Sequence, residues 1–441
     1  MNRPIRRRVP GATVITVLSL LLLVACGSDS SDVPENRQFA NDPVATRSAT
    51  DEPTAEPTKV PTTAGTGAPD QATPETLLRT RGAPSTLYTL SGDRMVALGF
   101  SGGAAVELTV AIPDDVSILG YDASPTGDRV GVLMTLPDGN PVVQFFDASG
   151  TPVSEAYPIL TESPGASPVA SPVASPVGMP ATSPGATSVS WIPQGNGVLV
   201  VAGYAIIDVS VDDGPHAVDT DAVSGEIRHA SVSPKGDQIL LLVRAEDGSE
   251  GGWLLDRAKG NVHEVRALRT DPGKGISYLS WLPGGNGVIF VQGEVSGDVI
   301  IRGKLFRYLF RNEVPDLVAT SGQGGPLSTI TNVAISPGGH SVAYDVSVWD
   351  SGEWSAHSMW VRSLSKDVPG IQVPVNVGQP VAQIAWSNEG LFWVQERGGE
   401  RSMRLMTPGG QVEEVQSGAT PVASPVASPV TSASPVATPV D

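Results

Sequence analysis

Few side chains in this sequence have the types and spacing that catalysis requires. The clearest is Ser101, which lies in GFSGG and so fits G-x-S-x-G, the spacing that holds a nucleophilic serine on a strand-to-helix turn. Here the motif joins MVALGF to AAVELTV, two runs that are typical of strands, and no long α/β segment follows. We therefore expect Ser101 to be a hairpin residue and not a nucleophile.

Metal-ligating residue types are present without the spacing of a metal site. The 5 histidines show no H-E-x-x-H or other paired ligand spacing, which argues against zinc. The acidic stretch DVSVDDGPHAVDTD, from Asp208 to Asp221, could offer oxygen ligands to calcium. It lacks the alternating D-x-D-x-D-G order, and a solvated hairpin loop explains it better. We expect no catalytic residue, no metal and no cofactor.

Two tryptophans are candidates for contacts with a partner. Trp349 and Trp354 lie in VWDSGEWSAHSMW, in a predicted polar link between two strands, where exposed aromatic side chains could contact a protein or a sugar. The alternative is that they cover a sheet edge. By contrast, Trp191, Trp281 and Trp386 occupy the same strand position in three of the predicted blades, which indicates packing.

The first residues predict export. A positively charged run from Arg3 to Arg8 precedes an apolar run that ends at Ala25 and is short for a membrane span. It ends in LVAC, with Cys26 the only cysteine of the chain. This resembles the lipobox of bacterial lipoproteins, which implies cleavage after residue 25 and acylation of Cys26. The alternative is an ordinary signal peptide or a poor membrane anchor. We expect an extracytoplasmic protein, lipid-anchored to the membrane of a bacterium.

The net charge excludes one class of partner, and the low-complexity segments indicate where the folded domain begins and ends. The net charge of −18 opposes binding to the phosphate backbone, so we expect no nucleic-acid partner. Residues 26–84, the insertion 161–188 and the tail 418–441 are rich in Ser, Thr, Pro, Ala and Val without an apolar period, which predicts disorder. The Ser/Pro/Val segments could be glycosylated or could be solvated insertions without a role of their own.

Between residues 85 and 417 a unit recurs: a short apolar strand, then S-P-x-G-[D/N], then a β-rich run. It appears as DASPTGDRVGVLM, SWIPQGNGVLVV, SVSPKGDQILLLV, SWLPGGNGVIFV and AISPGGHSVAYDV, with weaker copies around Ser91 and Asn388. Ser, Pro and Gly at these positions are typical of a type I turn. Each unit therefore begins with a tight hairpin, and two further strands follow it.

Four antiparallel strands per unit, repeated along the chain, predict an all-β fold, a β-propeller of four-stranded blades. Without the insertion, seven blades would have about 44 residues each and six about 51, whereas WD-type blades have about 40–45. Seven blades are favoured over six. The first unit is short, and we expect it to lend strands that close the ring with the last blade.

The S-P-x-G-[D/N] hairpin resembles the TolB-type, WD-like propeller repeat over about 300 residues. This resemblance implies the fold, whereas blades of this kind serve scaffolds and peptidase-associated propellers alike. Our hypothesis is a monomeric, lipid-anchored scaffold of the cell envelope that binds a protein or a glycan and is not an enzyme. The alternative is a propeller hydrolase that acts on a lactone or a sugar at a site in the central channel.

Overall fold

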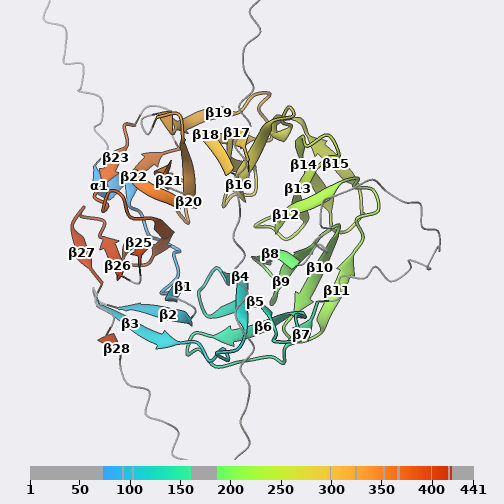
Figure 1. The fold of residues 1–441 in the computed structure, drawn as a ribbon, viewed down its shortest axis with the longest axis horizontal. Coiled ribbons are helices and arrows are strands. Elements are labelled where there is room, and N and C mark those ends of the chain that lie inside the picture. The colour runs from blue at the N-terminus through green and yellow to red at the C-terminus, as the bar shows by residue number, and fades with distance from the viewer. Residues whose placement is uncertain are drawn as a thin grey trace, which may run out of the picture. The chain divides into compact units, whose positions relative to one another are not determined.

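The computed structural model of the chain describes residues 73–91, 94–101, 104–159, 186–297, 299–322, 325–350, 353–364, 368–398, 400–415 and 418–419. Within these ranges the chain forms seven four-stranded sheets that follow one another around a ring (Figure 1). The prediction of an all-β propeller with seven blades is therefore confirmed. The signal segment 1–25, Cys26, most of the segment 26–84, nearly all of the insertion 161–188 and nearly all of the tail 418–441 lie outside the described residues.

The blades are numbered here in chain order. Blade 1 contains β1 (Thr86–Ser91), β2 (Arg94–Ser101), β3 (Ala104–Thr109) and β28 (Gly418–Ala419). Blade 2 contains β4 (Ser117–Ala123), β5 (Arg129–Thr135), β6 (Pro141–Asp147) and β7 (Tyr157–Pro158). Blade 3 contains β8 (Ala186–Trp191), β9 (Gly197–Ala202), β10 (Ala205–Ser210) and β11 (Gly214–Val218).

Blade 4 contains β12 (Glu226–Val232), β13 (Gln238–Arg244), β14 (Glu250–Asp256) and β15 (Val262–Val265), and the 3-10 helix η1 (Arg266–Leu268) follows it. Blade 5 contains β16 (Lys274–Trp281), β17 (Gly287–Ser296), β18 (Val299–Leu309) and β19 (Asp316–Thr320). Blade 6 contains β20 (Ser328–Ile335), β21 (Ser341–Asp350), β22 (Glu353–Ser363) and β23 (Ile371–Val373). Blade 7 contains β24 (Val381–Ser387), β25 (Gly390–Arg397), β26 (Glu400–Met406) and β27 (Val412–Glu414).

The predicted turn joins the first two strands of the blades. In blade 2 the amide of Gly127 donates to the carbonyl oxygen of Ser124 at 2.9 Å, and the same bond recurs at 2.8 Å in blades 4 and 6. The hydroxyl of Ser124 also accepts the amide of Arg129 at 3.2 Å, which locks the start of β5. Gly127 has φ +73°, and a Cβ there would overlap the carbonyl oxygen of Thr86, so this position requires glycine.

The core is divided among the seven interfaces between neighbouring blades. Each of seven buried apolar clusters joins two adjacent blades, and the last joins blade 7 to blade 1. Trp191, Trp281 and Trp386 are buried in these interfaces, which confirms their packing role. The indole nitrogen of Trp281 donates to the carbonyl oxygen of Ser231 in the preceding blade at 3.1 Å. Because burial is shared between blades, the interfaces stabilise the ring as a whole.

The ring closes at blade 1 in the direction opposite to our expectation. The first unit does not lend strands to the last blade; instead β28, from the far end of the chain, pairs in parallel with β3. The apolar contact across the closure includes Phe100 of blade 1 and Phe392 of blade 7, whose ring centroids lie 5.5 Å apart.

Ordered chain also precedes blade 1. The short helix α1 (Pro74–Leu77) lies within the segment 26–84, and Leu77 and Leu78 are buried against the cluster between blades 6 and 7. Among the residues that the structure describes, no helix has the length and apolar composition to cross a membrane.

Candidate functional site

The two rims of the ring carry different connections. Because successive antiparallel strands alternate in direction, the S-P-x-G turns lie on one rim, and the hairpins between second and third strands lie on the other, which we call the hairpin rim. The longest hairpins belong to blades 5 and 6, where β17, β18, β21 and β22 have 10 or 11 residues each. The repeated motif therefore builds one rim, and the variable hairpins project from the opposite one.

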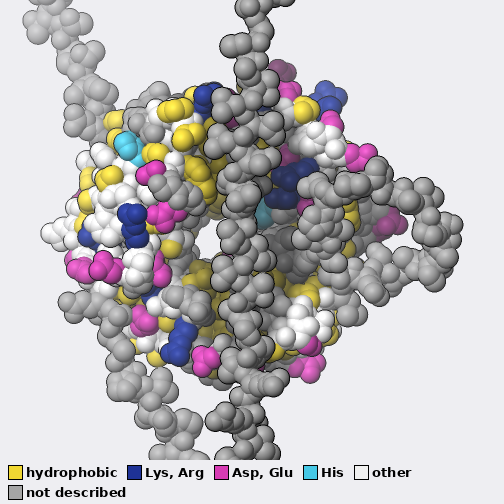
Figure 2. Space-filling view, viewed as in Figure 1, with side chains coloured by type: hydrophobic (Ala, Val, Ile, Leu, Met, Phe, Trp, Pro, Cys, Tyr) yellow, Lys and Arg dark blue, Asp and Glu magenta, His cyan; other side chains and the backbone are white. Residues whose placement is uncertain are grey.

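A pocket of about 790 Å³ opens at the hairpin rim between blades 4 and 5. Three other described pockets have volumes of 210–290 Å³. The polar lining of the large pocket comes from the first three strands of blade 4 and the inner strand of blade 5, and its apolar lining includes the tip of the β17–β18 hairpin. The polar side chains are Arg228, His229, Arg244, Glu250, Lys274, Ser277 and Tyr278. Figure 2 shows Lys and Arg side chains gathered on the inner side of the ring, where Figure 1 places β12 and β16.

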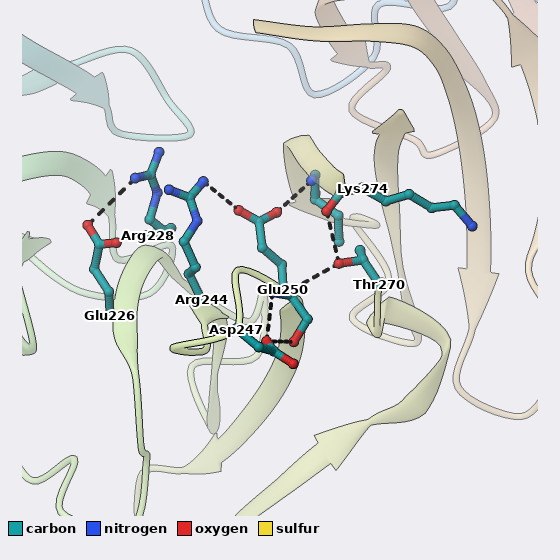
Figure 3. A network of polar contacts seen from close by, with 9 residues as sticks. Glu226, Arg228, Arg244, Asp247, Glu250, Thr270 and Lys274 are labelled. Carbon is teal, nitrogen blue, oxygen red and sulfur yellow. Dashed lines mark hydrogen bonds and ion pairs between the residues drawn. The ribbon is translucent and has the colours of Figure 1, made fainter. Parts of the chain in front are cut away.

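Glu250 anchors one side of this pocket. Its side chain is 3% exposed, and its Oε1 accepts a hydrogen bond from Arg244 Nη2 at 3.0 Å. Its Oε2 accepts the backbone amide of Ile276 in blade 5 at 2.6 Å. The amide of Glu250 itself donates to Thr270 Oγ1 at 2.8 Å, and this hydroxyl donates to the carbonyl oxygen of Lys274 at 3.1 Å. Both carboxylate oxygens thus accept a hydrogen bond, and together they fix Arg244 and the start of β16 (Figure 3).

A β-bulge in the inner strand of blade 4 positions the second arginine. The pairing of β12 with β13 shifts between Ile227 and His229, so Arg228 is the extra residue of the bulge. Arg228 lies 3.6 Å from Glu226, and both side chains are about two-fifths exposed, at 42% and 38%. Figure 3 shows the guanidinium groups of Arg228 and Arg244 side by side, with the carboxylates of Glu226 and Glu250 at the two ends of the row. The order is acid, base, base, acid.

His229 lines the same pocket in a neutral state. Desolvation by burial lowers its pKa to about 4, so the imidazole carries no charge at pH 7. Its Nε2 atom is buried and makes no hydrogen bond to any residue that the structure describes. Burial likewise raises the pKa of Tyr278 to about 12. The pocket therefore combines two adjacent cations with neutral groups that could exchange hydrogen bonds with a ligand.

The tryptophans singled out in the sequence are placed on the hairpin rim. Trp349 and Trp354 face each other across the β21–β22 pair, with ring centroids 5.1 Å apart and planes at 64°. They lie in the strands and not in a polar link, because both strands extend further than their sequence indicated, and each ring is partly buried by the other. They belong to blade 6, next to blade 5, and neither lines the pocket.

The remaining sequence candidates occupy ordinary structural positions. Ser101 ends β2 and pairs with Ala104 across the β2–β3 hairpin. Asp208 lies in β10 and forms an ion pair with Arg257 at 2.8 Å. No group of three or more His, Cys, Asp or Glu side chains in the described ranges could hold a metal ion.

Sequence reasoning missed Arg228, Arg244 and Glu250. If the β12–β13 hairpin had no bulge, Arg228 would pair with Val243, and Ile227 would pair with Arg244. The two arginines would then lie on opposite faces of the sheet. The available signal was weaker: two arginines flank the first hairpin of one unit in an otherwise acidic chain.

Comparisons with known proteins reveal similarity in fold and none in sequence family. The chain matches no protein-family model and no curated protein sequence. Among solved structures it is similar to a prolyl endopeptidase, with 11% identity and a TM-score of 0.48, over 76% of this chain and 50% of that chain. The chain thus spans about half the length of that enzyme.

Two further solved structures represent other propeller types. A 6-phosphogluconolactonase homologue from Bacteroides uniformis has 12% identity and a TM-score of 0.47, over 75% of this chain and 95% of that chain. A protein described as TolB from Agrobacterium tumefaciens has 17% identity and a TM-score of 0.37, over 52% of this chain and 79% of that chain.

These structures correct one expectation from the sequence. We expected that the chain is not an enzyme, whereas the similar structures are mainly propeller enzymes, namely peptidases and lactonases. A missing sequence motif is not evidence of absent chemistry, because side chains from different blades can line one pocket, as Arg228 of blade 4 and Tyr278 of blade 5 do here. At these identities the similarity shows the fold alone, and this fold does not exclude catalysis.

Proposed function

We propose that the protein is an extracytoplasmic, lipid-anchored scaffold of the cell envelope that binds a protein or a glycan at its hairpin rim. The LVAC sequence before Cys26 supports the anchor and the location. Two or more acyl chains on Cys26 would provide stable membrane attachment.

One observation supports the binding role above the others: the pocket between blades 4 and 5. It is concave, combines polar and charged side chains with an apolar wall, and opens at the rim that carries the longest hairpins. Ligand sites in proteins are concave and contain polar groups that fix the orientation of the ligand. The Trp349–Trp354 pair on the next blade adds aromatic surface to the same rim.

Site-specific photo-crosslinking in intact cells tests the binding role. A photoreactive residue at Val295, which is 45% exposed on the β17–β18 hairpin, should capture an envelope component. The matched control is Lys235, an exposed residue of the S-P-x-G turn on the opposite rim. Equal capture at both positions, or no capture at Val295, would contradict recognition at the hairpin rim.

The anchor has a separate test. Radiolabelled palmitate should label the wild-type chain, and Cys26→Ser should release it from the membrane fraction. A Cys26→Ser protein that still sediments with membranes would refute lipid attachment at this residue.

A second candidate function, a hydrolase, is favoured by His229. A neutral imidazole with an unengaged Nε2, in the same pocket as two guanidinium groups, could accept a proton from water while the arginines stabilise an oxyanion. Assays with lactone and ester substrates should then show turnover that His229→Ala abolishes and His263→Ala, in the exposed outer strand β15, retains. Turnover that both variants retain would exclude His229 as the base.

A further inference from the structure

We propose that the pocket between blades 4 and 5 binds a carboxylate that carries an apolar group, the chemistry of a peptide C-terminus ending in an aliphatic residue. This inference rests on the proposed binding function and specifies its ligand.

The arginine pair provides the anion contact. Two guanidinium groups of the same charge lie side by side in the middle of the row, and each has a carboxylate partner on its outer side only (Figure 3). A single carboxylate contact leaves most N–H donors of a guanidinium available. A ligand carboxylate placed over the pair would accept from both forks and would reduce their mutual repulsion.

The charge of the row favours a monoanion over a dianion. The two arginines are already balanced by Glu226 and Glu250, and His229 contributes no positive charge at pH 7 because its pKa is about 4. Lys274 is engaged with Asp271 at 2.9 Å, and Figure 3 shows its side chain extending away from the arginines. A phosphate dianion would thus add two negative charges to a chain of net charge −18, whereas a carboxylate adds one.

The rest of the wall is suited to an aliphatic group. Leu242, Ile276 and Leu279 line the pocket from the strands of blades 4 and 5. Val295, Val299 and Ile300 line it from the β17–β18 hairpin, and Val295 is 45% exposed. Leu242, Ile276 and Leu279 are already buried, so a ligand that covered the side chains of the hairpin would remove apolar surface from water, which favours binding in addition to the charge contact.

Calorimetry on the full-length chain in detergent tests the proposal with four probes. N-acetyl-leucine should bind, because it has both the carboxylate and the aliphatic group. N-acetyl-leucinamide lacks the charge and inorganic phosphate lacks the aliphatic group, so both should bind at least tenfold more weakly. The acid 4-methylpentanoate keeps the carboxylate and the aliphatic chain but lacks the amide. If it binds as strongly as N-acetyl-leucine, the natural ligand is a free acid. If it binds more weakly, the natural ligand is a peptide C-terminus.

Variants assign the contact to the arginines. Arg228→Gln should weaken the binding of N-acetyl-leucine at least tenfold while it leaves the ion pair between Arg244 and the buried Glu250 intact. This variant keeps the test valid if Arg244→Gln fails to fold. The control is Arg397→Gln, because Arg397 is exposed on the same rim and pairs with Glu353 at 3.0 Å outside the pocket. Unchanged affinity in Arg228→Gln, equal binding of the amide, or tighter binding of phosphate would overturn the inference. If one of these results is obtained while a photoreactive residue at Val295 still captures an envelope component in cells, the proposed binding function stands and only the assignment of the ligand fails.

Discussion

The carboxyl group of Asp122 should make the stability of the propeller fall as the pH rises. Asp122 lies in β4 of blade 2, and its Oδ2 accepts the backbone amide of Trp191 in blade 3 at 2.7 Å. Its Oδ1 accepts the amide of Ala123 at 2.9 Å. Desolvation by burial outweighs these two hydrogen bonds and raises the pKa of Asp122 from 3.8 to about 6. The folded state therefore holds the proton more tightly than the unfolded state.

The sign and size of the effect follow from these two pKa values. Below pH 3.8 both states are protonated, and the contribution of Asp122 to stability is fully present. Between pH 3.8 and 6 the unfolded chain loses the proton while the folded protein keeps it, so the free energy of unfolding decreases. At 1.36 kcal/mol per pKa unit, the decrease is about 3 kcal/mol and is complete above pH 6.

Asp122→Asn isolates this contribution because asparagine keeps an acceptor oxygen and cannot ionise. Urea unfolding followed by tryptophan fluorescence at pH 4 and pH 7.5 gives the difference between variant and wild type, in which the other titrating groups cancel. The difference should shift by about 2.4 kcal/mol in favour of the variant at the higher pH, because the unfolded chain is already partly ionised at pH 4. An equal difference at the two pH values would refute the reasoning, because it would mean that the folded Asp122 has an ordinary pKa.

Three other changes have expected outcomes. His229→Gln should have the opposite pH dependence, because the pKa of His229 is about 4 in the folded protein and 6.5 in the unfolded chain. As the pH falls from 6.5 to 4, the free energy of unfolding of the wild type should decrease by about 3 kcal/mol relative to the variant in the same unfolding assay. Gly252→Ala should cost about 1–3 kcal/mol in chemical denaturation, because the new Cβ would lie 2.7 Å from Leu268 Cβ; no loss would show that η1 moves freely. Deleting residues 418–441 removes the two backbone pairs of β28 and should lower the free energy of unfolding by about 1 kcal/mol. Phe392→Ala should lower it by about 3–5 kcal/mol, because Phe392 belongs to the apolar cluster at the ring closure. Thermal melts of the two variants test this order, and a larger loss in the deletion variant would contradict closure by packing.

Local sequence patterns were sufficient to predict the repeating part of this protein. The S-P-x-G turn depends on residues within one span of four, where proline presets φ and glycine accepts a positive φ, so its hydrogen bond between residues such as Gly127 and Ser124 was predictable. The apolar runs around each turn gave the strands, and their spacing gave seven blades. The packing role of Trp281 followed from its recurring position. Export and acylation at Cys26 stay predictions from the sequence.

The tertiary structure decided where the blades join and where a ligand could bind. The pairing of β28 with β3 joins residues more than three hundred positions apart, and no local pattern specifies such a partner. The bulge at Arg228 shifts the register by one residue, and that shift aligns Glu226 with Arg244. Glu250 then holds Arg244 because β14 pairs with β13 and blade 5 presents the amide of Ile276. Turns depend on neighbours in sequence, whereas the site depends on side chains that only packing between blades brings together.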